Sequence, residues 1–270
     1  MMPRPGSTGI AVDVGPDAAL GVTAPALEAL GFDTLWLAGG QLDALERVDD
    51  VVRATSRSAV GTAVVPLGVH DVPAVVALRA RLADRLVLGV GGPQQPRPLA
   101  ALGRYLDALD AAGIGPGDRL LAALGPRKLD IARERAAGAM TLLTTPAATA
   151  AARARLGPDR LLVVHQLAAL QPDAAAARAA VREPLAFLAG VPGYRASFRR
   201  MGFTDDEVTA LADRLVDAVA VWGDAAAIAA HLGEHRAAGA DHVVVSLLPT
   251  GAGSPLERAG AVARALGLSR

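Results

Sequence analysis

The sequence has no cysteine, which excludes disulfide bonds, thiolate metal ligands and a cysteine nucleophile. Lysine is almost as scarce, because Lys128 is the only one among 27 basic residues. An enzyme that forms an imine needs a lysine, and this one lies where a helix is expected to begin and not within a strand. The residue types therefore argue against thiol, disulfide and imine chemistry.

Neither sign of charge is in excess, since 27 basic and 27 acidic residues give a formal net charge of zero. Nucleic-acid-binding domains carry a basic patch, so no nucleic-acid partner is expected. The longest uncharged run, residues 136–152, contains Pro146 and several threonines and does not predict a membrane span. The N-terminus, MMPRPGSTG, lacks the apolar segment of a signal peptide. We expect a soluble cytoplasmic protein.

Apolar residues are abundant. They make up 52% of the chain against 20% charged residues, so a large core can form and disorder is not expected. A length of 270 residues fits one large α/β barrel or two smaller domains.

Short apolar runs alternate with helical patterns along the whole chain. Strands are predicted at residues 8–14, 34–38, 59–65, 85–90, 119–125, 139–145, 160–170 and 242–248. Helices are predicted at residues 24–31, 42–55, 72–82, 99–113, 126–138, 146–157, 224–239 and 255–267. Continuous Val/Leu runs are typical of parallel strands that are buried on both faces.

Eight strand–helix units in one chain of this length predict a (β/α)8 TIM barrel, with a doubly wound open sheet as the alternative. No domain boundary is evident. We expect one domain over residues 1–270, with a mostly helical insertion at about 172–221 between the seventh and eighth strands.

Three glycines, Gly89, Gly91 and Gly92, follow the fourth predicted strand in the stretch GVGGPQQPRP. A dinucleotide-binding fingerprint would need glycine at position 94, which is Gln94, and a helix that begins at once. Three prolines prevent that helix. In a barrel this stretch lies at the catalytic mouth, where glycines let the backbone approach a flat ligand. A plain glycine turn is the alternative interpretation.

Four residues at predicted strand ends and loops are candidates for function. Asp13 ends the first strand, where a carboxylate could be catalytic or could form an Asx turn with Gly15. His70 follows the third strand and His165 ends the seventh, so either could move a proton or be structural. Trp36, in the second strand, is either a core indole or a wall against a ring system.

His231 and His235 lie four residues apart in HLGEH. Zinc peptidases use this spacing but need glutamate directly after the first histidine, and here Glu234 is displaced. We therefore expect a solvated helix face and predict no metal site. Arg127 and the first amides of its helix could instead hold an anion.

Ten segments resemble one known family, in order and spacing. They are LEALGFDTLWL (27–37), VVRATSRSAVGTAVV (51–65), HDVPAVVAL (70–78), RLVLGVG (85–91), YLDALDAAG (105–113), LAALGPRKLDIARERAAGA (121–139), TPAATAAARARLGPD (145–159), PGYRASFRRMGF (192–203), DRLVDAVAVWGD (213–224) and GADHVVVSLL (239–248). Together they resemble the bacterial luciferase-like superfamily and, within it, a group of probable coenzyme F420-dependent oxidoreductases.

The resemblance implies a luciferase-like barrel that holds a deazaflavin, or less often FMN, across its carboxyl-end mouth. The reaction would be hydride transfer between C5 of the deazaflavin and a small organic substrate. Deazaflavin does not readily activate oxygen, so such members act as dehydrogenases or reductases. The protein would position the cofactor and supply a proton donor or acceptor. Members often form homodimers.

The resemblance also assigns residues by position. The third-strand segment that forms a bulge behind the ring matches Gly61, Thr62, Val64 and Val65. The fourth-strand end beside the ring or tail matches Gly89, Gly91 and Gly92. The loops that would hold the ribityl and phosphate parts contain Gly125, Arg127, Thr144 and Thr145. Trp36 and Tyr194 would lie nearer the substrate. His70 would be the proton relay, with Asp13 or His165 behind it.

The chain departs from the family pattern around the mouth. The group has Gly-Val-Ser-His-Ala-Pro where this chain has the shorter GVGGPQQPRP, and LAGG replaces a segment that carries glutamate. An expected aromatic near Leu142 is also absent. Two alternatives follow: an FMN-dependent monooxygenase, or a cofactor-free barrel that serves as a non-redox enzyme or a binding subunit.

Overall fold

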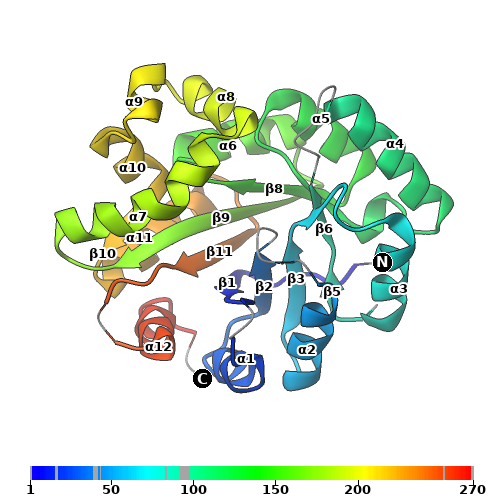
Figure 1. The fold of residues 1–270 in the computed structure, drawn as a ribbon, viewed down its shortest axis with the longest axis horizontal. Coiled ribbons are helices and arrows are strands. Elements are labelled where there is room, and N and C mark those ends of the chain that lie inside the picture. Colours follow the sequence, from blue (N-terminus) through cyan, green and yellow to red (C-terminus); the bar gives the residue numbers. More distant parts are fainter. Residues whose placement is uncertain are drawn as a thin grey trace.

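Parallel strands form a ring that helices surround, as the computed structural model in Figure 1 shows. The structure describes residues 2–15, 18–38, 42, 44–82, 84–91, 98–251 and 253–268. The strands of the ring are β1 (Thr8–Val12), β2 (Thr34–Ala38), β3 (Ala59–Ala63), β4 (Val65–Pro66), β5 (Leu86–Val87), β6 (Gly89–Gly91), β7 (Leu120–Ala122), β8 (Gly138–Leu142), β9 (Leu161–Leu170) and β11 (His242–Leu247).

The sheet closes on itself. Hydrogen-bonded neighbours follow the order β4-β6-β7-β8-β9-β11-β1-β2-β3-β5. β3 and β4 are two parts of one strand, interrupted at the cis peptide bond between Ala63 and Val64, and β5 and β6 are two parts of the next. β4 and β5, at the two ends of this order, belong to the third and fourth strands of the barrel. These two strands pair with each other twice, through β3 with β5 and through β4 with β6, so the ring is closed. The (β/α)8 barrel is confirmed and the open sheet is excluded.

Helices cover the outside of the ring. They are α1 (Leu20–Ala29), α2 (Glu46–Ala54), α3 (Val72–Leu82), α4 (Pro98–Ala111), α5 (Pro126–Arg135), α6 (Pro146–Leu156), α11 (Ala225–Ala237) and α12 (Pro255–Ala265), with a 3₁₀ turn, η2, at Pro116–Asp118. Several begin at an N-cap side chain that accepts a backbone hydrogen bond, as Thr145, Asp224 and Ser254 do. Such caps satisfy backbone N–H groups of the first turn and fix where these helices begin.

An added segment between β9 and α11 lies at one side of the ring, at the upper left of Figure 1. It comprises α7 (Ala174–Ala189), α8 (Pro192–Arg200), α9 (Asp205–Thr209), α10 (Asp213–Val219) and β10 (Ala220–Gly223). β10 pairs with residues 167–170 of β9, beyond the part that pairs with β8. The sequence did not predict β10, because its apolar residues directly continue the pattern of the preceding helix.

Side chains of the ring alternate between two apolar layers. One cluster fills the barrel interior and consists of Met2, Trp36, Ala59, Val87, Leu120, Met140, Val163 and Val244. A larger cluster, which includes Leu35, Val60 and Leu121, packs between the strands and the helices. A third lies under the added segment, around Leu185 and Phe198. The interior cluster closes the barrel below its mouth.

No helix within the described ranges combines the length and the apolar character that a membrane crossing requires.

Candidate active site

The mouth of the barrel is lined by small side chains. Four alanines, Ala11, Ala38, Ala63 and Ala122, lie beyond the interior layer toward the carboxyl ends of their strands, and strand alternation points them inward as well. All four are partly exposed, in contrast to the buried layer beneath them. Small residues here leave room above the interior cluster, so a flat ligand could lie across the carboxyl ends of the strands.

Ser246 contacts one predicted catalytic residue, His165, and lines the same cavity as another, Asp13. A cavity of about 380 Å³ between the ends of β1 and β11 is lined by Asp13 and Ser246. The hydroxyl of Ser246 lies 3.1 Å from Nε2 of His165, on the neighbouring β9. Asp13 is exposed, and its Oδ1 accepts a hydrogen bond of 2.9 Å from the backbone N–H of Gly15. The Asx turn therefore forms, and it leaves the carboxylate at the mouth.

His165 is held neutral at physiological pH. Its side chain is buried, and burial, with a smaller contribution from the nearby His242, lowers its pKa to about 4. A neutral imidazole can share a hydrogen bond with the Ser246 hydroxyl, and it becomes charged if it takes up a proton.

His70, the predicted proton relay, lies apart from this group on the loop after β4. Its Nε2 is 3.0 Å from the carbonyl oxygen of Leu42. That oxygen can only accept, so Nε2 donates in this contact. Within the described residues no contact joins His70 to Asp13 or His165.

Trp36 is a core residue in this structure. The indole is fully buried in the interior cluster, and its Nε1 donates a hydrogen bond of 2.9 Å to Nε2 of His242. Gly61, directly opposite on β3, leaves the space that the ring occupies, because a Cβ there would lie 2.3 Å from Trp36 Cε3. The core interpretation explains both residues. Contact of Trp36 with substrate and of Gly61 with cofactor stays a prediction.

Close packing between neighbouring strands explains the glycines at the rim. The Thr62 hydroxyl donates to the carbonyl oxygen of Gly89 and accepts from its N–H, both at 2.9 Å. A Cβ at Gly91 would lie 2.3 Å from Cγ2 of Val64. These contacts bring the third and fourth strands close together at the mouth, with Val65 buried behind them. Gly92 lies outside the described residues, as do most of the trimmed rim and the LAGG glycines.

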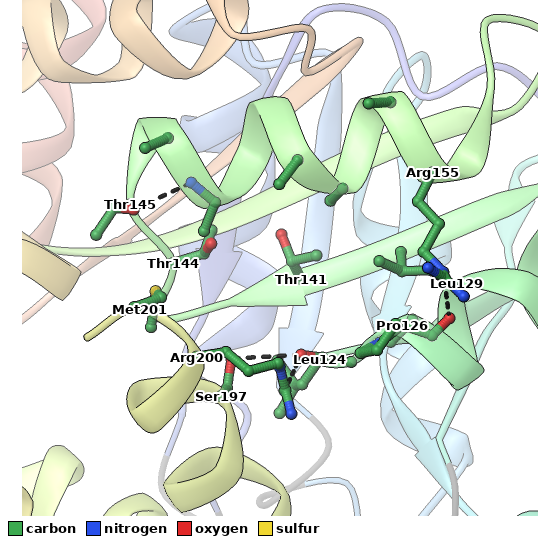
Figure 2. Close-up of a pocket in the computed structure, with 17 residues that line it drawn as sticks. Leu124, Pro126, Leu129, Thr141, Thr144, Thr145, Arg155, Ser197, Arg200 and Met201 are labelled. Carbon is green, nitrogen blue, oxygen red and sulfur yellow. Dashed lines mark hydrogen bonds between the residues drawn. The ribbon is translucent and has the colours of Figure 1, made fainter. Parts of the chain in front are cut away.

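The loops after β7 and β8 border a slot of about 910 Å³, shown in Figure 2. Three predicted cofactor contacts line it, namely Gly125, Thr144 and Thr145. Arg127 is exposed on the first turn of α5 and is not part of the lining. The sequence did not predict two further lining residues, Ser197 and Arg200, because they come from α8 in the added segment.

Tyr194, predicted to contact substrate, lies on α8 and packs against the cluster under the added segment. Its ring centroid is 6.3 Å from that of Phe198. Burial raises the pKa of its hydroxyl to about 12, so the group stays protonated.

The expectation of a solvated helix face is wrong for His235, whereas His231 is partly exposed. His235 is fully buried, and its Nδ1 lies 2.8 Å from the Thr149 hydroxyl on α6. Its Nε2 accepts a hydrogen bond from the side-chain amide of Gln166 on β9. α11 packs against both β9 and α6, so more of its surface is covered than its sequence pattern indicates. Within the described ranges, no group of three or more potential ligands could hold a metal ion.

No protein-family model and no curated protein matches the sequence. Solved structures do match along nearly the whole chain. An F420-dependent secondary alcohol dehydrogenase in complex with an F420–acetone adduct is 12% identical, with a TM-score of 0.75, covering 99% of this chain and 100% of that one. The coenzyme F420-dependent tetrahydromethanopterin reductase from Methanopyrus kandleri is 16% identical, with a TM-score of 0.71 and coverage of 96% and 97%.

A flavin enzyme is similar too. The oxygenating constituent of 3,6-diketocamphane monooxygenase from Pseudomonas putida, solved with FMN, is 12% identical, with a TM-score of 0.66 and coverage of 97% and 98%. The chain therefore shares its fold with these two F420-dependent enzymes and with this FMN-containing monooxygenase constituent.

Proposed function

We propose that this protein is a coenzyme F420-dependent oxidoreductase that transfers a hydride to or from a small organic substrate. The observation that carries the proposal is the end-to-end likeness to F420-dependent enzymes, in which the whole of each chain takes part. The sequence resemblance to the same group, found in ten separate segments, supports it independently.

The residues at the mouth fit a flat ring with a polar tail. The small side chains of Ala11, Ala38, Ala63 and Ala122 would let a fused ring system lie above the interior cluster. Hydroxyls of Thr144 and Thr145 lie at the edge where the tail would leave the mouth. Flat ligands are held by mainly apolar walls with a few placed polar groups, and the mouth has this character.

When bound, the deazaflavin would supply or accept the hydride at C5. What remains for this chain is to place the substrate and move one proton. Ser246 is well positioned for that task, since it lines a cavity between the ends of β1 and β11 and its hydroxyl lies 3.1 Å from His165 Nε2. We assign Ser246 and His165 to the proton path, with Asp13 as the charged group beside it. His70, with Nδ1 available, is the alternative donor or acceptor from the other side of the mouth.

The FMN-dependent monooxygenase is the second candidate, and the similar FMN-containing structure favours it. The two functions differ in their need for oxygen. Anaerobic turnover of a panel of secondary alcohols and ketones with oxidised or reduced F420 supports the first. Substrate oxidation that requires FMN and oxygen supports the second.

The proton path is tested in whichever assay gives turnover. General acid–base groups contribute about 10²–10⁴-fold to rate. His165→Gln and Ser246→Ala are each expected to lower kcat by at least about tenfold while cofactor affinity stays within about twofold. If His70→Gln alone abolishes kcat and both other variants keep it, the proton passes through His70 instead.

A further inference from the structure

The slot in Figure 2 lies outside the barrel interior, in the layer between strands and helices. Its floor includes Thr141 of β8, which points outward because the preceding residue, Met140, belongs to the interior cluster. Large side chains normally fill this layer to crystal-like density. Here α6 contributes Ala148, Ala151 and Ala152, and the space stays open at about 910 Å³.

A buried hydroxyl points into the slot without a partner. Thr141 is 5% exposed, and its Oγ1 makes no hydrogen bond within the described part of the protein. Figure 2 shows this oxygen directed across the slot toward α6. A buried hydroxyl that has lost water and gained no partner destabilises the folded state, so it indicates a missing hydrogen-bonding group.

The charge at the slot is positive. Arg155 is neutralised by Asp130, with its Nη2 2.6 Å from a carboxylate oxygen. Arg200 lies over Gly125 and, among the described residues, donates a hydrogen bond only to the carbonyl oxygen of Leu124, at 2.6 Å. No acidic side chain from the described part of the chain lines the slot. The Arg200 guanidinium can therefore accept an anionic partner at the edge of a mainly apolar space.

The wall formed by α6 is fixed before any ligand arrives. The Gln166 side-chain amide donates a hydrogen bond of 2.6 Å to the carbonyl oxygen of Thr144, and it also contacts His235. His235 in turn holds the Thr149 hydroxyl of α6. Gln166, His235 and Thr149 are all fully buried. Because these hydrogen bonds already order α6, little conformational entropy is lost when a ligand binds, which favours affinity.

We propose that the slot binds a small molecule with one carboxylate on an apolar body, the carboxylate on Arg200, a polar atom on Thr141 and the body along the alanines of α6. The lining of α6 from Thr145 to Arg155 extends over about 15 Å, so an elongated body fits. The site does not depend on the proposed hydride chemistry. It does share Gly125, Thr144 and Thr145 with the region assigned to the cofactor tail, so the test must separate the two.

The test is isothermal titration of the purified full chain with decanoate and 2-naphthoate, each beside its neutral counterpart, decanol and 2-naphthol. The acids are expected to bind at least tenfold more tightly than the alcohols. Ala148→Leu fills the slot and should weaken acid binding at least tenfold, whereas Ala150→Leu, the same change on the exposed face of α6, should leave it unchanged.

Two polar variants complete the test. Arg200→Gln should remove the preference for acids over alcohols, while Arg199→Gln, which breaks only an exposed pair with Asp205, should not. Thr141→Val keeps shape and removes the unpartnered hydroxyl, so it should weaken binding severalfold without lowering the melting temperature. Thr209→Val, on α9, is its control and should not alter binding.

Three results would overturn the proposal. One is the absence of acid binding to the wild-type chain at millimolar concentration. Another is acid binding that Ala148→Leu leaves unchanged. The third is loss of F420 or FMN binding in Ala148→Leu while no acid binds the wild-type chain, which assigns the slot to the cofactor. Failure of the cofactor proposal alone gives a different pattern, namely acid binding without binding of F420 or FMN.

Discussion

The carboxylate of Glu28 on α1 accepts hydrogen bonds from three consecutive backbone N–H groups. They belong to Ser56, Arg57 and Ser58, at 3.0, 2.6 and 2.7 Å from Oε1. Burial alone would raise the pKa of Glu28, but these bonds outweigh it and lower the pKa from 4.5 to about 2. One side chain thus ties α1 to the turn that leads into β3.

Glu28→Gln should destabilise the protein by about 2 kcal/mol at pH 7, since bonds to a charged acceptor are worth more than bonds to an amide. The folded pKa lies below the unfolded one, so the stabilisation is complete above pH 4.5 and is lost as pH falls toward 2. Urea unfolding at pH 7 measures the difference. Glu183→Gln, on an exposed part of α7, is the control, and equal losses in both variants would refute the assignment.

At the scale of elements, three neighbouring strands share one large side chain. Trp36 of β2 occupies the space left by Gly9 of β1 and Gly61 of β3, where a Cβ would lie 2.5 and 2.3 Å from the indole. One tryptophan between two glycines fills this part of the interior, so strand spacing here depends on the absence of side chains at both positions.

Gly61→Ala should therefore cost about 1–3 kcal/mol, the usual effect of overpacking a filled core. Gly103→Ala makes the same change in open space on α4 and should stabilise the protein by about 0.5–1 kcal/mol. Thermal unfolding of the two variants separates the outcomes. A neutral Gly61→Ala would mean that the indole can move out of the interior.

Element positions were largely predictable because their signals are local. Caps and glycines mark the helix ends, and Val/Leu runs mark the strands, so β2 is predicted to the residue and α3 likewise. Which face of each helix or strand is buried was not predictable. The burial of His235 depends on which neighbours α11 meets, and the slot depends on α8 approaching the loop after β7. Both are contacts between segments far apart in the sequence.

The candidate site was predictable only in part for the same reason. Strand ends indicated Asp13 and His165. Ser246, which no local motif marks, contacts His165 and lines the same cavity as Asp13. Trp36 could not be placed from its sequence neighbours, because the glycines that enclose it lie on other strands. That the chain is one domain, and that it forms a homodimer, stay predictions.

At the scale of the whole molecule, three histidines are buried as neutral groups. They are His165, His235 and His242, and burial is the main cause that lowers the pKa of each to about 4. In the unfolded chain each would titrate near 6.5. Between these values the unfolded state binds protons that the folded state does not.

Stability should therefore be complete above pH 6.5 and fall toward pH 4, by up to about 4 kcal/mol per pH unit for three protons. Urea unfolding at pH 7.5, 6 and 5 measures the slope. His235→Gln should reduce the slope by about one proton, about 1.4 kcal/mol per pH unit. Equal stability at pH 7.5 and 5 would contradict the burial of neutral imidazoles.

The account as a whole depends on the mouth accepting a deazaflavin, because the fold is shared by F420-dependent and FMN-dependent enzymes alike. The most direct measurement is a fluorescence titration of the purified protein with coenzyme F420, with FMN titrated in parallel. We predict saturable binding of F420 at micromolar concentration and at least tenfold weaker binding of FMN. Tighter binding of FMN would favour the monooxygenase, and binding of neither would mean that the trimmed rim has lost the cofactor and that this barrel performs other chemistry.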